Sequence, residues 1–199
     1  PTVIAWLNGR ILVGEGASQM KYQLKKGKNI WYSFKMELGE DLGAKYYDSE
    51  LREVDPFRIK NPVDAARVFF AYLKYLIIKY CTENNISTDI LYAVSIPASF
   101  EANQRKDLLD ALMANDMKVS KQALIDEPNA AFISYAVSRA AEDRPMFISP
   151  DYNSKVLVFD FGGGTCDISI LEIGQSANGF FSKNIAISKF TKLGGDDID

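Results

Sequence analysis

Residues 156–171 of this 199-residue chain read VLVFDFGGGTCDISIL, and the rest of the sequence is interpreted outward from this stretch. An apolar run broken only by Asp160 predicts a buried strand, and three consecutive glycines predict a tight turn. In residues 165–171 polar and apolar side chains then alternate, which places Thr165 and Asp167 on one face of a second strand. The stretch therefore predicts a β-hairpin with polar groups gathered at its turn.

The residue types around this turn suit a phosphate site. Glycines let backbone N–H groups approach a ligand without interference from a Cβ atom, and a concave row of amide donors suits phosphate oxygens. An isolated Asp160 in a buried apolar strand is costly unless it is paired or binds a cation. Thr165 and Asp167 supply a hydroxyl and a carboxylate that can orient a water molecule. The alternative is a tight glycine-rich hairpin whose aspartate is bonded to nearby amides.

The composition limits the possible chemistry. The chain is 47% hydrophobic and 25% charged, as in ordinary globular proteins, and its net charge of -3 gives no basic surface for nucleic acid. No apolar run approaches the roughly 18 residues of a membrane span. There is no histidine, which excludes Ser-His-Asp catalysis and histidine-bound zinc. The two cysteines, Cys81 and Cys166, lack metal-type spacing, and a reducing, cytoplasmic location is expected.

The first half of the chain predicts a strand pair and a long helix. Residues 2–14 contain Asn8-Gly9, a strong hairpin turn, between two apolar runs. Residues 15–60 predict irregular structure with short helices and strands. Asn61-Pro62 then opens an amphipathic helix that is expected to end near Asn84-Asn85. Its apolar stripe consists of Val63, Ala66, Phe70, Leu73, Ile77 and Tyr80.

The second half predicts alternating strands and helices. A strand is expected at residues 90–96 and a helix at 102–115, with Leu108, Leu109, Leu112 and Met113 on its inner face. A third helix starts at Asp126-Glu127-Pro128, residues 142–155 form a connecting loop, and residues 184–190 form a further strand. This order of elements indicates an α/β architecture.

The hairpin stretch closely resembles the second phosphate-binding motif of the Hsp70 chaperones, and three further resemblances follow the same order. Residues 93–100, followed by Gln104-Arg105, resemble the family's "VPAYF…QR" segment, and residues 125–131 resemble its "INEPTAA" helix start. Residues 193–199 resemble its "LGGEDFD" segment. Residues 2–5, 12–14 and 34–39 are more weakly similar to the family's first strands and to its catalytic-lysine segment.

The resemblance implies an actin-like ATPase (ribonuclease H-like) fold, with two lobes around a nucleotide cleft. Residues 1–145 correspond to lobe I, with an outer subdomain at 1–85 and an inner one at 86–145. Residues 146–199 correspond to the first strands of lobe II with the phosphate hairpin. The chain lacks the family's "GIDLGTT" loop and its adenosine-binding "GG(S)R" segment. We therefore expect a fragment of the ATPase domain that binds ATP weakly and is inactive on its own.

The resemblance also implies a set of site residues. The implied catalytic residues are Lys35, Glu127, Thr165 and Asp167; the implied nucleotide-binding residues are Asp160, Gly162, Gly163, Gly164, Thr165, Gly194 and Gly195; and Asp160 and Glu127 hold Mg²⁺ through water. Pro97 and Arg105 match positions that link nucleotide state to the partner domain. Two alternatives stay open, in which Glu127 is only a favourable charge at a helix start and Lys35 is only a solvated lysine.

The function implied by the resemblance is that of a chaperone which binds Mg-ATP or Mg-ADP and couples hydrolysis to protein folding. Its partners would be nucleotide, unfolded client polypeptides and co-chaperones, in a stress response. Because the region around Lys35 matches weakly, the alternative is a non-hydrolysing Hsp70-derived regulatory or interaction protein. A sugar or acetate kinase of the same fold is a third reading, but it is not expected to carry all these motifs together.

Overall fold

A computed structural model describes residues 1–142, 153–162, 166–176, 179–188 and 194–195 of the chain. The chain divides into two compact units. The first comprises residues 1–92 and 101–119, and the second comprises residues 93–100 and 120–199. The lobes predicted at 1–145 and 146–199 stay a prediction, since a compact unit is not by itself a lobe.

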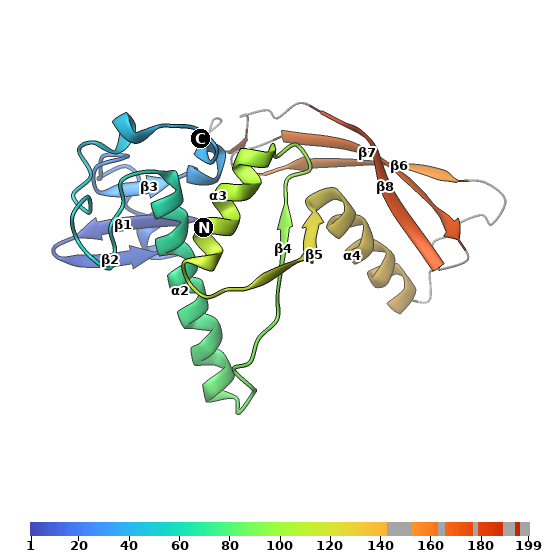
Figure 1. Cartoon of the computed structure of the whole chain (residues 1–199), viewed down its shortest axis with the longest axis horizontal. Coiled ribbons are helices and arrows are strands. Elements are labelled where there is room, and N and C mark those ends of the chain that lie inside the picture. The colour runs from blue at the N-terminus through green and yellow to red at the C-terminus, as the bar shows by residue number, and fades with distance from the viewer. Residues whose placement is uncertain (143–152, 163–165, 177–178, 189–193, 196–199) are drawn as a thin grey trace. The chain divides into compact units, whose positions relative to one another are not determined.

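The first unit begins with a small antiparallel sheet in the order β2-β1-β3. Its strands are β1 (Val3–Leu7), β2 (Arg10–Val13) and β3 (Ile30–Tyr32), followed in Figure 1 from the blue N-terminus. Asn8 and Gly9 both adopt positive φ, 52° and 73°, which is the conformation the predicted turn requires. The short helix α1 (Glu15–Ser18) covers the sheet, and Val3, Ala5, Ala17 and Ile30 form its buried core.

Residues 33–60 are irregular, as predicted, and contain only two short 3-10 helices among the described elements. These are η1 (Phe34–Glu37) and η2 (Gly43–Tyr46). The side chains of Phe34, Met36 and Leu38 are buried, and the removal of their apolar surface from water holds η1 against the core.

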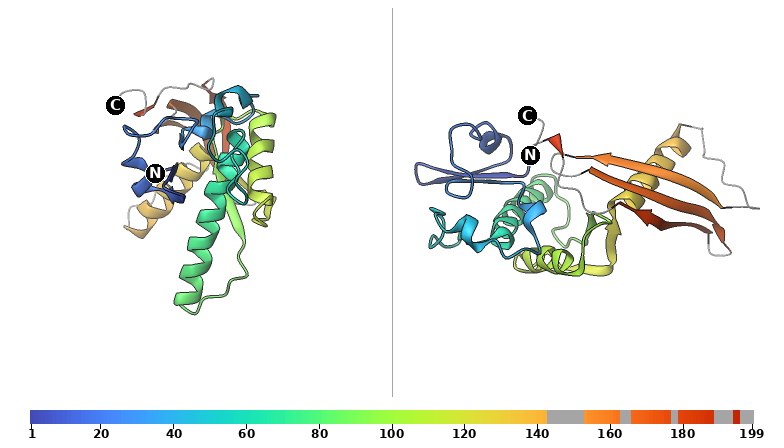
Figure 2. Two further views of the ribbon diagram at one scale, coloured as in Figure 1. Left: turned by 90° about the vertical axis from the view of Figure 1, so that its left-hand side faces the viewer. Right: turned by 90° about the horizontal axis from the view of Figure 1, so that it is seen from above.

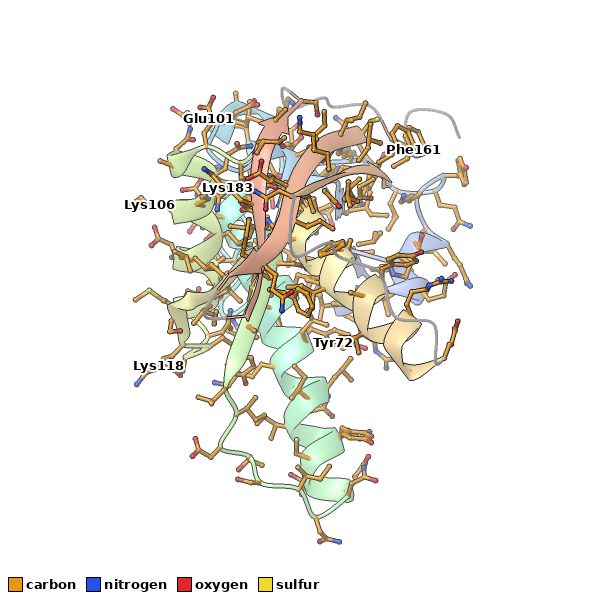
Figure 3. The ribbon with its side chains drawn as sticks, turned by 90° about the vertical axis from the view of Figure 1, so that its right-hand side faces the viewer. Tyr72, Glu101, Lys106, Lys118, Phe161 and Lys183 are labelled. Atoms are coloured by element: carbon orange, nitrogen blue, oxygen red, sulfur yellow. The ribbon has the colours of Figure 1, made fainter. Side chains whose placement is uncertain are left out.

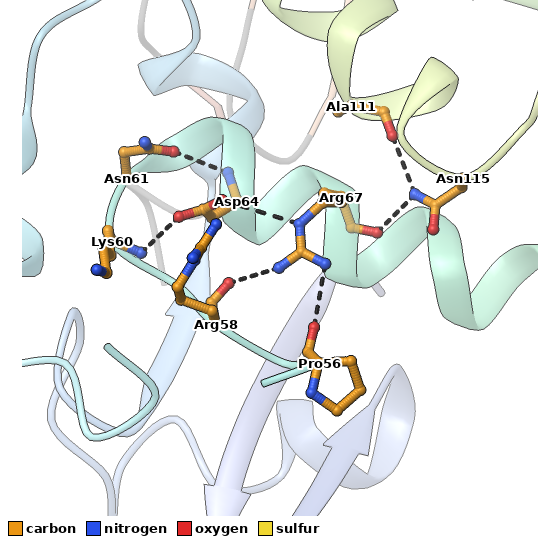
Figure 4. Close-up of polar contacts among 8 residues, drawn as sticks. All are labelled: Pro56, Arg58, Lys60, Asn61, Asp64, Arg67, Ala111 and Asn115. Atoms are coloured by element: carbon orange, nitrogen blue, oxygen red, sulfur yellow. Dashed lines mark hydrogen bonds and ion pairs between the residues drawn. The ribbon is translucent and has the colours of Figure 1, made fainter. Parts of the chain in front are cut away.

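The predicted long helix is confirmed as α2 (Pro62–Glu83). The Asn61 side chain accepts a hydrogen bond of 2.8 Å from the Asp64 N–H, and the Asp64 carboxylate accepts one of 2.9 Å from the Lys60 N–H (Figure 4). Arg67 donates to the carbonyls of Pro56 and Arg58 and so fastens the preceding segment to the helix. The predicted apolar stripe is wrong at its far end, because Tyr80 is 61% exposed whereas the next residue, Cys81, is buried.

The next helix of the first unit is α3 (Ala102–Met113), which packs on α2. The Glu101 side chain accepts a hydrogen bond from the backbone of Gln104, and the Gln104 side chain accepts one from the Glu101 N–H, which caps the helix start reciprocally. The buried face consists of Gln104, Leu108, Ala111 and Leu112. The prediction that Met113 lies on this face is wrong, since it is 65% exposed; successive helical residues turn by ~100°, so Met113 falls beside the buried stripe.

The second unit contains two sheets and one helix. Strands β4 (Tyr92–Ile96) and β5 (Val119–Asp126) pair with each other, and β5 leads directly into α4 (Glu127–Ala141). The other sheet is an antiparallel meander of β6 (Ser154–Phe161), β7 (Cys166–Ser176) and β8 (Gly179–Ile187). Helix α4 lies along one face of this meander, as the two views in Figures 1 and 2 show. The predicted hairpin, third helix and late strand are therefore present.

The two faces of the β6-β7-β8 sheet differ in burial. On one face Leu171 and Ile173 are fully buried against Phe132 of α4, together with Val156 and Val158. On the other face the side chains of β6 are open to solvent, with Leu157 63%, Phe159 60% and Phe161 44% exposed (Figure 3 labels Phe161). The prediction that residues 156–161 form a buried strand is thus correct for one face only.

The longest helix, α2, is amphipathic and carries charged residues along its length. Among the helices of the described segments, none combines the length and the apolar character that crossing a membrane requires.

Candidate functional site

The register of β6 and β7 brings two carboxylates together at the hairpin end. Asp160 lies directly opposite Asp167, and residues directly opposite in an antiparallel pair project from the same face of the sheet. Farther from the turn, the same face carries Val156 and Leu171, which α4 covers. The face therefore changes from an apolar, helix-covered half to a polar half next to the turn.

Asp167 is the buried carboxylate of this polar half. It is only 6% exposed, and its Oδ1 accepts a hydrogen bond of 2.8 Å from the Ser99 hydroxyl. Ser99 follows Pro97, which is fully buried after the end of β4. Burial of an ionised carboxylate is tolerated when it is hydrogen-bonded, so this contact accounts for the position of Asp167.

Asp160 is exposed, which corrects the reasoning from the sequence. The apolar run around it indicated a buried aspartate in need of a partner, but its neighbours Phe159 and Phe161 project from the open face. The argument that a buried charge needs a partner applies instead to Asp167. Directly opposed like charges repel, so the pair of Asp160 and Asp167 favours a nearby cation.

The predicted glycines come together in part. The Gly195 N–H donates a 3.0 Å hydrogen bond to the carbonyl of Gly162, so the segment that contains Gly194 and Gly195 reaches the hairpin end. Gly194 is buried there. The other predicted turn residues, Gly163, Gly164 and Thr165, lie outside the described residues. Of the loop predicted at residues 142–155, residues 143–152 also lie outside them, and Ser154 and Lys155 belong to β6.

A second polar contact region lies where β5 passes into α4. Glu127 is the first residue of α4 and is half-buried, and Pro128 follows it as predicted. The neighbouring Asp126 accepts a hydrogen bond of 2.8 Å from the Asn184 side chain of β8. One turn along α4, the Asn129 side-chain oxygen accepts a hydrogen bond of 2.5 Å from the Ser182 hydroxyl. These contacts fix the N-terminus of α4 to the sheet that carries the hairpin.

Lys35 belongs to the first unit. It lies half-buried in η1, between the buried side chains of Phe34 and Met36. The following Gly39 has a φ of 80°; its N–H donates to the Asp107 carboxylate at 2.7 Å, and its carbonyl accepts from the Asn103 side chain at 2.8 Å. The backbone that presents Lys35 is therefore held on both sides, by apolar burial and by α3.

The donor set of the second unit suits a hard cation held in part by water. Asp160 and Asp167 offer carboxylate oxygens, which Mg²⁺ prefers, and Mg²⁺ commonly keeps several waters and binds through one or two carboxylates. Within the part of the chain that the structure describes, no three cysteine, aspartate or glutamate side chains gather into a metal cage. The two carboxylates thus match the oxygen ligands that Mg²⁺ prefers.

Two site residues escaped the sequence reasoning. Ser99 contacts Asp167, and Asn184 contacts Asp126, although neither was singled out from the sequence. The available signal for Ser99 was its place just after a strand and Pro97, because ligands of open α/β sheets bind beyond the carboxyl ends of strands. Asn184 carried no such signal, because its contact with Asp126 depends on the position of β8 beside the end of β5 in the folded chain.

Comparison with known proteins agrees with this picture. The family model described as "Hsp70 protein" matches residues 1–199. The chain is 28% identical over 221 residues to a "Heat shock cognate HSP70 protein" of Trypanosoma brucei brucei, and 32% identical over 200 residues to a "Chaperone protein DnaK" of Mycoplasma mobile. Both matches cover all of this chain but only 29% and 28% of the relatives. The chain therefore belongs to the Hsp70 family and has the actin-like ATPase fold of that family.

Proposed function

We propose that this chain supplies one side of a Mg-ATP site in an Hsp70-like chaperone, where ATP hydrolysis is coupled to the folding of client polypeptides. The observation that carries the proposal is the hairpin end, where Asp160 faces Asp167 and Ser99 holds Asp167 by a 2.8 Å hydrogen bond. The Gly195–Gly162 hydrogen bond supports it, because it brings the segment of Gly194 and Gly195 to the same end of the sheet.

In this proposal Asp167 positions the attacking water. A carboxylate has about four lone-pair sites, so the Ser99 bond fixes its orientation while leaving acceptor capacity for a water. Burial of Asp167 keeps that orientation rigid, and the transfer of a phosphoryl group depends mainly on positioning and charge neutralisation. Thr165 is proposed to assist Asp167 in orienting the water.

The remaining predicted residues would each contact a different part of the bound Mg-nucleotide. Asp160 and Glu127 would hold Mg²⁺ through water, and bound Mg²⁺ supplies neutralisation of the negative charge on phosphate oxygens. Lys35 would bind the terminal phosphate. The backbone amides of Gly162, Gly163, Gly164 and Gly194 would bind the other phosphate oxygens. Gly195, whose N–H donates to the Gly162 carbonyl, would hold its segment close to the nucleotide.

The proposed setting is the cytoplasm, with co-chaperones and unfolded polypeptides as partners. Cys81 and Cys166 are both free thiols in the structure, which is compatible with a reducing compartment.

The test is Asp167→Ala in the protein that carries this sequence. Water positioning contributes ~10²–10⁴-fold to such reactions, so turnover should fall by about 100-fold or more while the Kd for Mg-ATP changes less than about threefold. Asp89→Ala, at an exposed site of the first unit, is the matched control and should leave both quantities unchanged. Unchanged turnover in Asp167→Ala would remove Asp167 from the mechanism. A wild-type protein that binds Mg-ATP but gives no product in a single-turnover assay would instead identify a non-hydrolysing regulatory protein.

A further inference from the structure

The first unit contains a cavity whose lining includes none of the residues proposed for the nucleotide site. Its volume is about 250 Å³, room for several water molecules, and it opens to solvent. Two lysines, three aromatic residues and one glutamate form most of its wall: Lys26, Lys45, Trp31, Tyr32, Tyr46 and Glu37.

The one carboxylate in this wall is already engaged. Glu37 is only 12% exposed; one oxygen accepts a 2.7 Å hydrogen bond from the Tyr46 hydroxyl, and the other lies 3.6 Å from the Lys45 ammonium. Glu37 therefore offsets the charge of Lys45. Its two oxygens are engaged by Tyr46 and Lys45 and do not pair with Lys26, the second lysine of the wall.

The positive charge of Lys26 is not offset by any carboxylate among the described residues. Its ammonium lies 4.4 Å from the centre of the Tyr32 ring, and the Lys21 ammonium lies 4.7 Å from the same ring centre. A cation–π contact at an exposed site contributes only about 0.5–1 kcal/mol and does not remove the charge. An anion bound beside Lys26 would offset its charge.

The backbone holds this cationic wall in place. The Gly27 N–H donates a 2.9 Å hydrogen bond to the Ile30 carbonyl, which closes the turn before β3. Gly27 has a φ of 79°, and a Cβ atom there would lie 2.5 Å from the carbonyl oxygen of Lys45. Only glycine therefore allows the segment of Lys26 to approach the segment of Lys45 so closely.

The wall also contains a hydrogen-bond donor without an acceptor. Trp31 is 2% exposed, and its indole N–H has no hydrogen-bond partner among the described residues. A buried donor without a partner costs about 1–3 kcal/mol. The cavity thus has an uncompensated positive charge in its wall, which favours a ligand that carries negative oxygens, and Trp31 lines the same cavity.

We propose that this cavity binds a small oxyanion with two or more negative charges, such as a diphosphate group, with Lys26 as its main contact and Lys21 and Lys45 at its sides. The proposal concerns residues of the first unit only and does not depend on the nucleotide site proposed for the second.

The experiment uses Trp31 as the reporter. The chain has two tryptophans, so Trp6→Phe leaves Trp31 as the single emitter. Pyrophosphate is titrated with the ionic strength held constant by NaCl, and we expect a saturable change in Trp31 emission. Lys26→Met should weaken the apparent affinity at least tenfold, and Lys26→Arg should largely retain it. Lys79→Met, an exposed lysine of the same unit that pairs with Glu83, should leave it unchanged.

Further arms identify the ligand class and separate this site from the nucleotide site. A response to pyrophosphate but not to citrate indicates phosphate groups, whereas a response to both indicates multivalent oxyanions in general, and each result supports the proposal. Asp167→Ala should retain the Trp31 response, and Lys26→Met should retain Mg-ATP turnover. The proposal is overturned if the emission change does not saturate, if it persists at full affinity in Lys26→Met and Lys21→Met, or if Asp167→Ala abolishes it.

Discussion

The hydrogen bond between Ser99 and Asp167 leads to a residue-scale prediction for the proposed site. A hydrogen bond to a charged group contributes ~1.5–3 kcal/mol, and Asp167 is buried, so Ser99→Ala should lower the free energy of unfolding by about 2 kcal/mol in urea denaturation. It should also slow ATP turnover more than it weakens Mg-ATP binding, because the carboxylate loses its fixed orientation. Ser99→Thr keeps the hydroxyl and should restore most of both properties.

The control for Ser99→Ala is Ser87→Ala, which removes an exposed hydroxyl that only accepts a 3.1 Å hydrogen bond from the Asp89 N–H. It should change stability by less than about 0.5 kcal/mol. Equal losses in Ser99→Ala and Ser87→Ala would show that the contact with Asp167 adds nothing to stability.

Tyr46 leads to a residue-scale prediction about pH. Burial, and then the hydrogen bond to the Glu37 carboxylate, raise the pKa of Tyr46 well above its ordinary value of 10.0. Above pH 10 the unfolded chain loses this proton while the folded chain keeps it, so the stability from Tyr46 is present below pH 10 and is lost as the pH rises further. Wild-type stability should therefore fall more steeply than that of Tyr46→Phe above pH 10, by up to about 1.4 kcal/mol per pH unit.

Urea denaturation of both proteins between pH 9 and pH 11 measures this difference directly. All other titratable groups are common to both proteins, so their effect cancels in the comparison. Parallel stability curves would show that Tyr46 ionises as readily in the folded chain as in the unfolded one.

At the residue scale, the sequence located the carboxylates of the hairpin but not their burial. Period-two alternation placed Asp167 on the polar face correctly, because strand geometry is local. The assignment of burial to Asp160 failed, because an apolar run does not tell how far along a strand another element covers it. Asp160 lies on the same face as Val156 and Val158, which pack beside α4, but it stands at the hairpin end and is exposed.

At the scale of elements, the two faces of the β6-β7 pair should respond differently to the same substitution. Leu171 is fully buried next to Phe132 of α4, whereas Leu157 is 63% exposed on the opposite face. Leu171→Ala should cost about 2–5 kcal/mol, because it leaves a cavity in the core, and Leu157→Ala should cost less than about 1 kcal/mol.

Thermal and urea denaturation of both variants test this asymmetry, and each variant is the matched control of the other. Similar losses of stability in the two variants would mean that the face opposite α4 is also packed in the folded protein and that Leu157 is buried there.

Elements with local signals were predicted well, and elements that depend on distant partners were not. The Asn8-Gly9 turn and the start of α2 at Asn61-Pro62 follow from backbone preferences within a few residues. Tyr80 and Met113 were assigned to buried faces, but each is exposed next to a buried residue, Cys81 and Leu112 respectively. Periodicity gives the spacing of side chains around a helix, but it does not give how wide a stripe the neighbouring elements cover.

At the scale of the whole molecule, the ordered motifs in the sequence are enough to indicate the family and, through it, the fold. They can do so because separate segments, such as residues 93–100 and 125–131, must each carry a specific backbone conformation in a fixed order. The motifs give little information on the cavity beside Trp31, because Glu37 is the one wall residue that lies in a segment resembling the family, residues 34–39.

The open face of the β6-β7-β8 sheet gives a whole-molecule prediction about association. Phe159 and Phe161 stack at 6.5 Å between ring centres, both are exposed, and Phe159 lies opposite Ile168, which is 39% exposed. A contiguous exposed apolar surface promotes association and binds apolar dyes. This chain by itself should therefore enhance the fluorescence of anilinonaphthalene sulfonate and self-associate with rising concentration. Phe159→Ser should reduce both effects several-fold and change the unfolding free energy by less than about 1 kcal/mol.

The matched control is Tyr22→Ser, because Tyr22 is 91% exposed and belongs to the first unit, whereas this sheet belongs to the second. It removes a comparable aromatic surface but should leave dye binding and association unchanged, since an isolated exposed aromatic residue does not form a patch. Sedimentation velocity at two concentrations measures the association. If Tyr22→Ser reduces it as much as Phe159→Ser does, association follows from general surface hydrophobicity. If Phe159→Ser alone abolishes it, the contact surface is the face of the sheet that α4 leaves open.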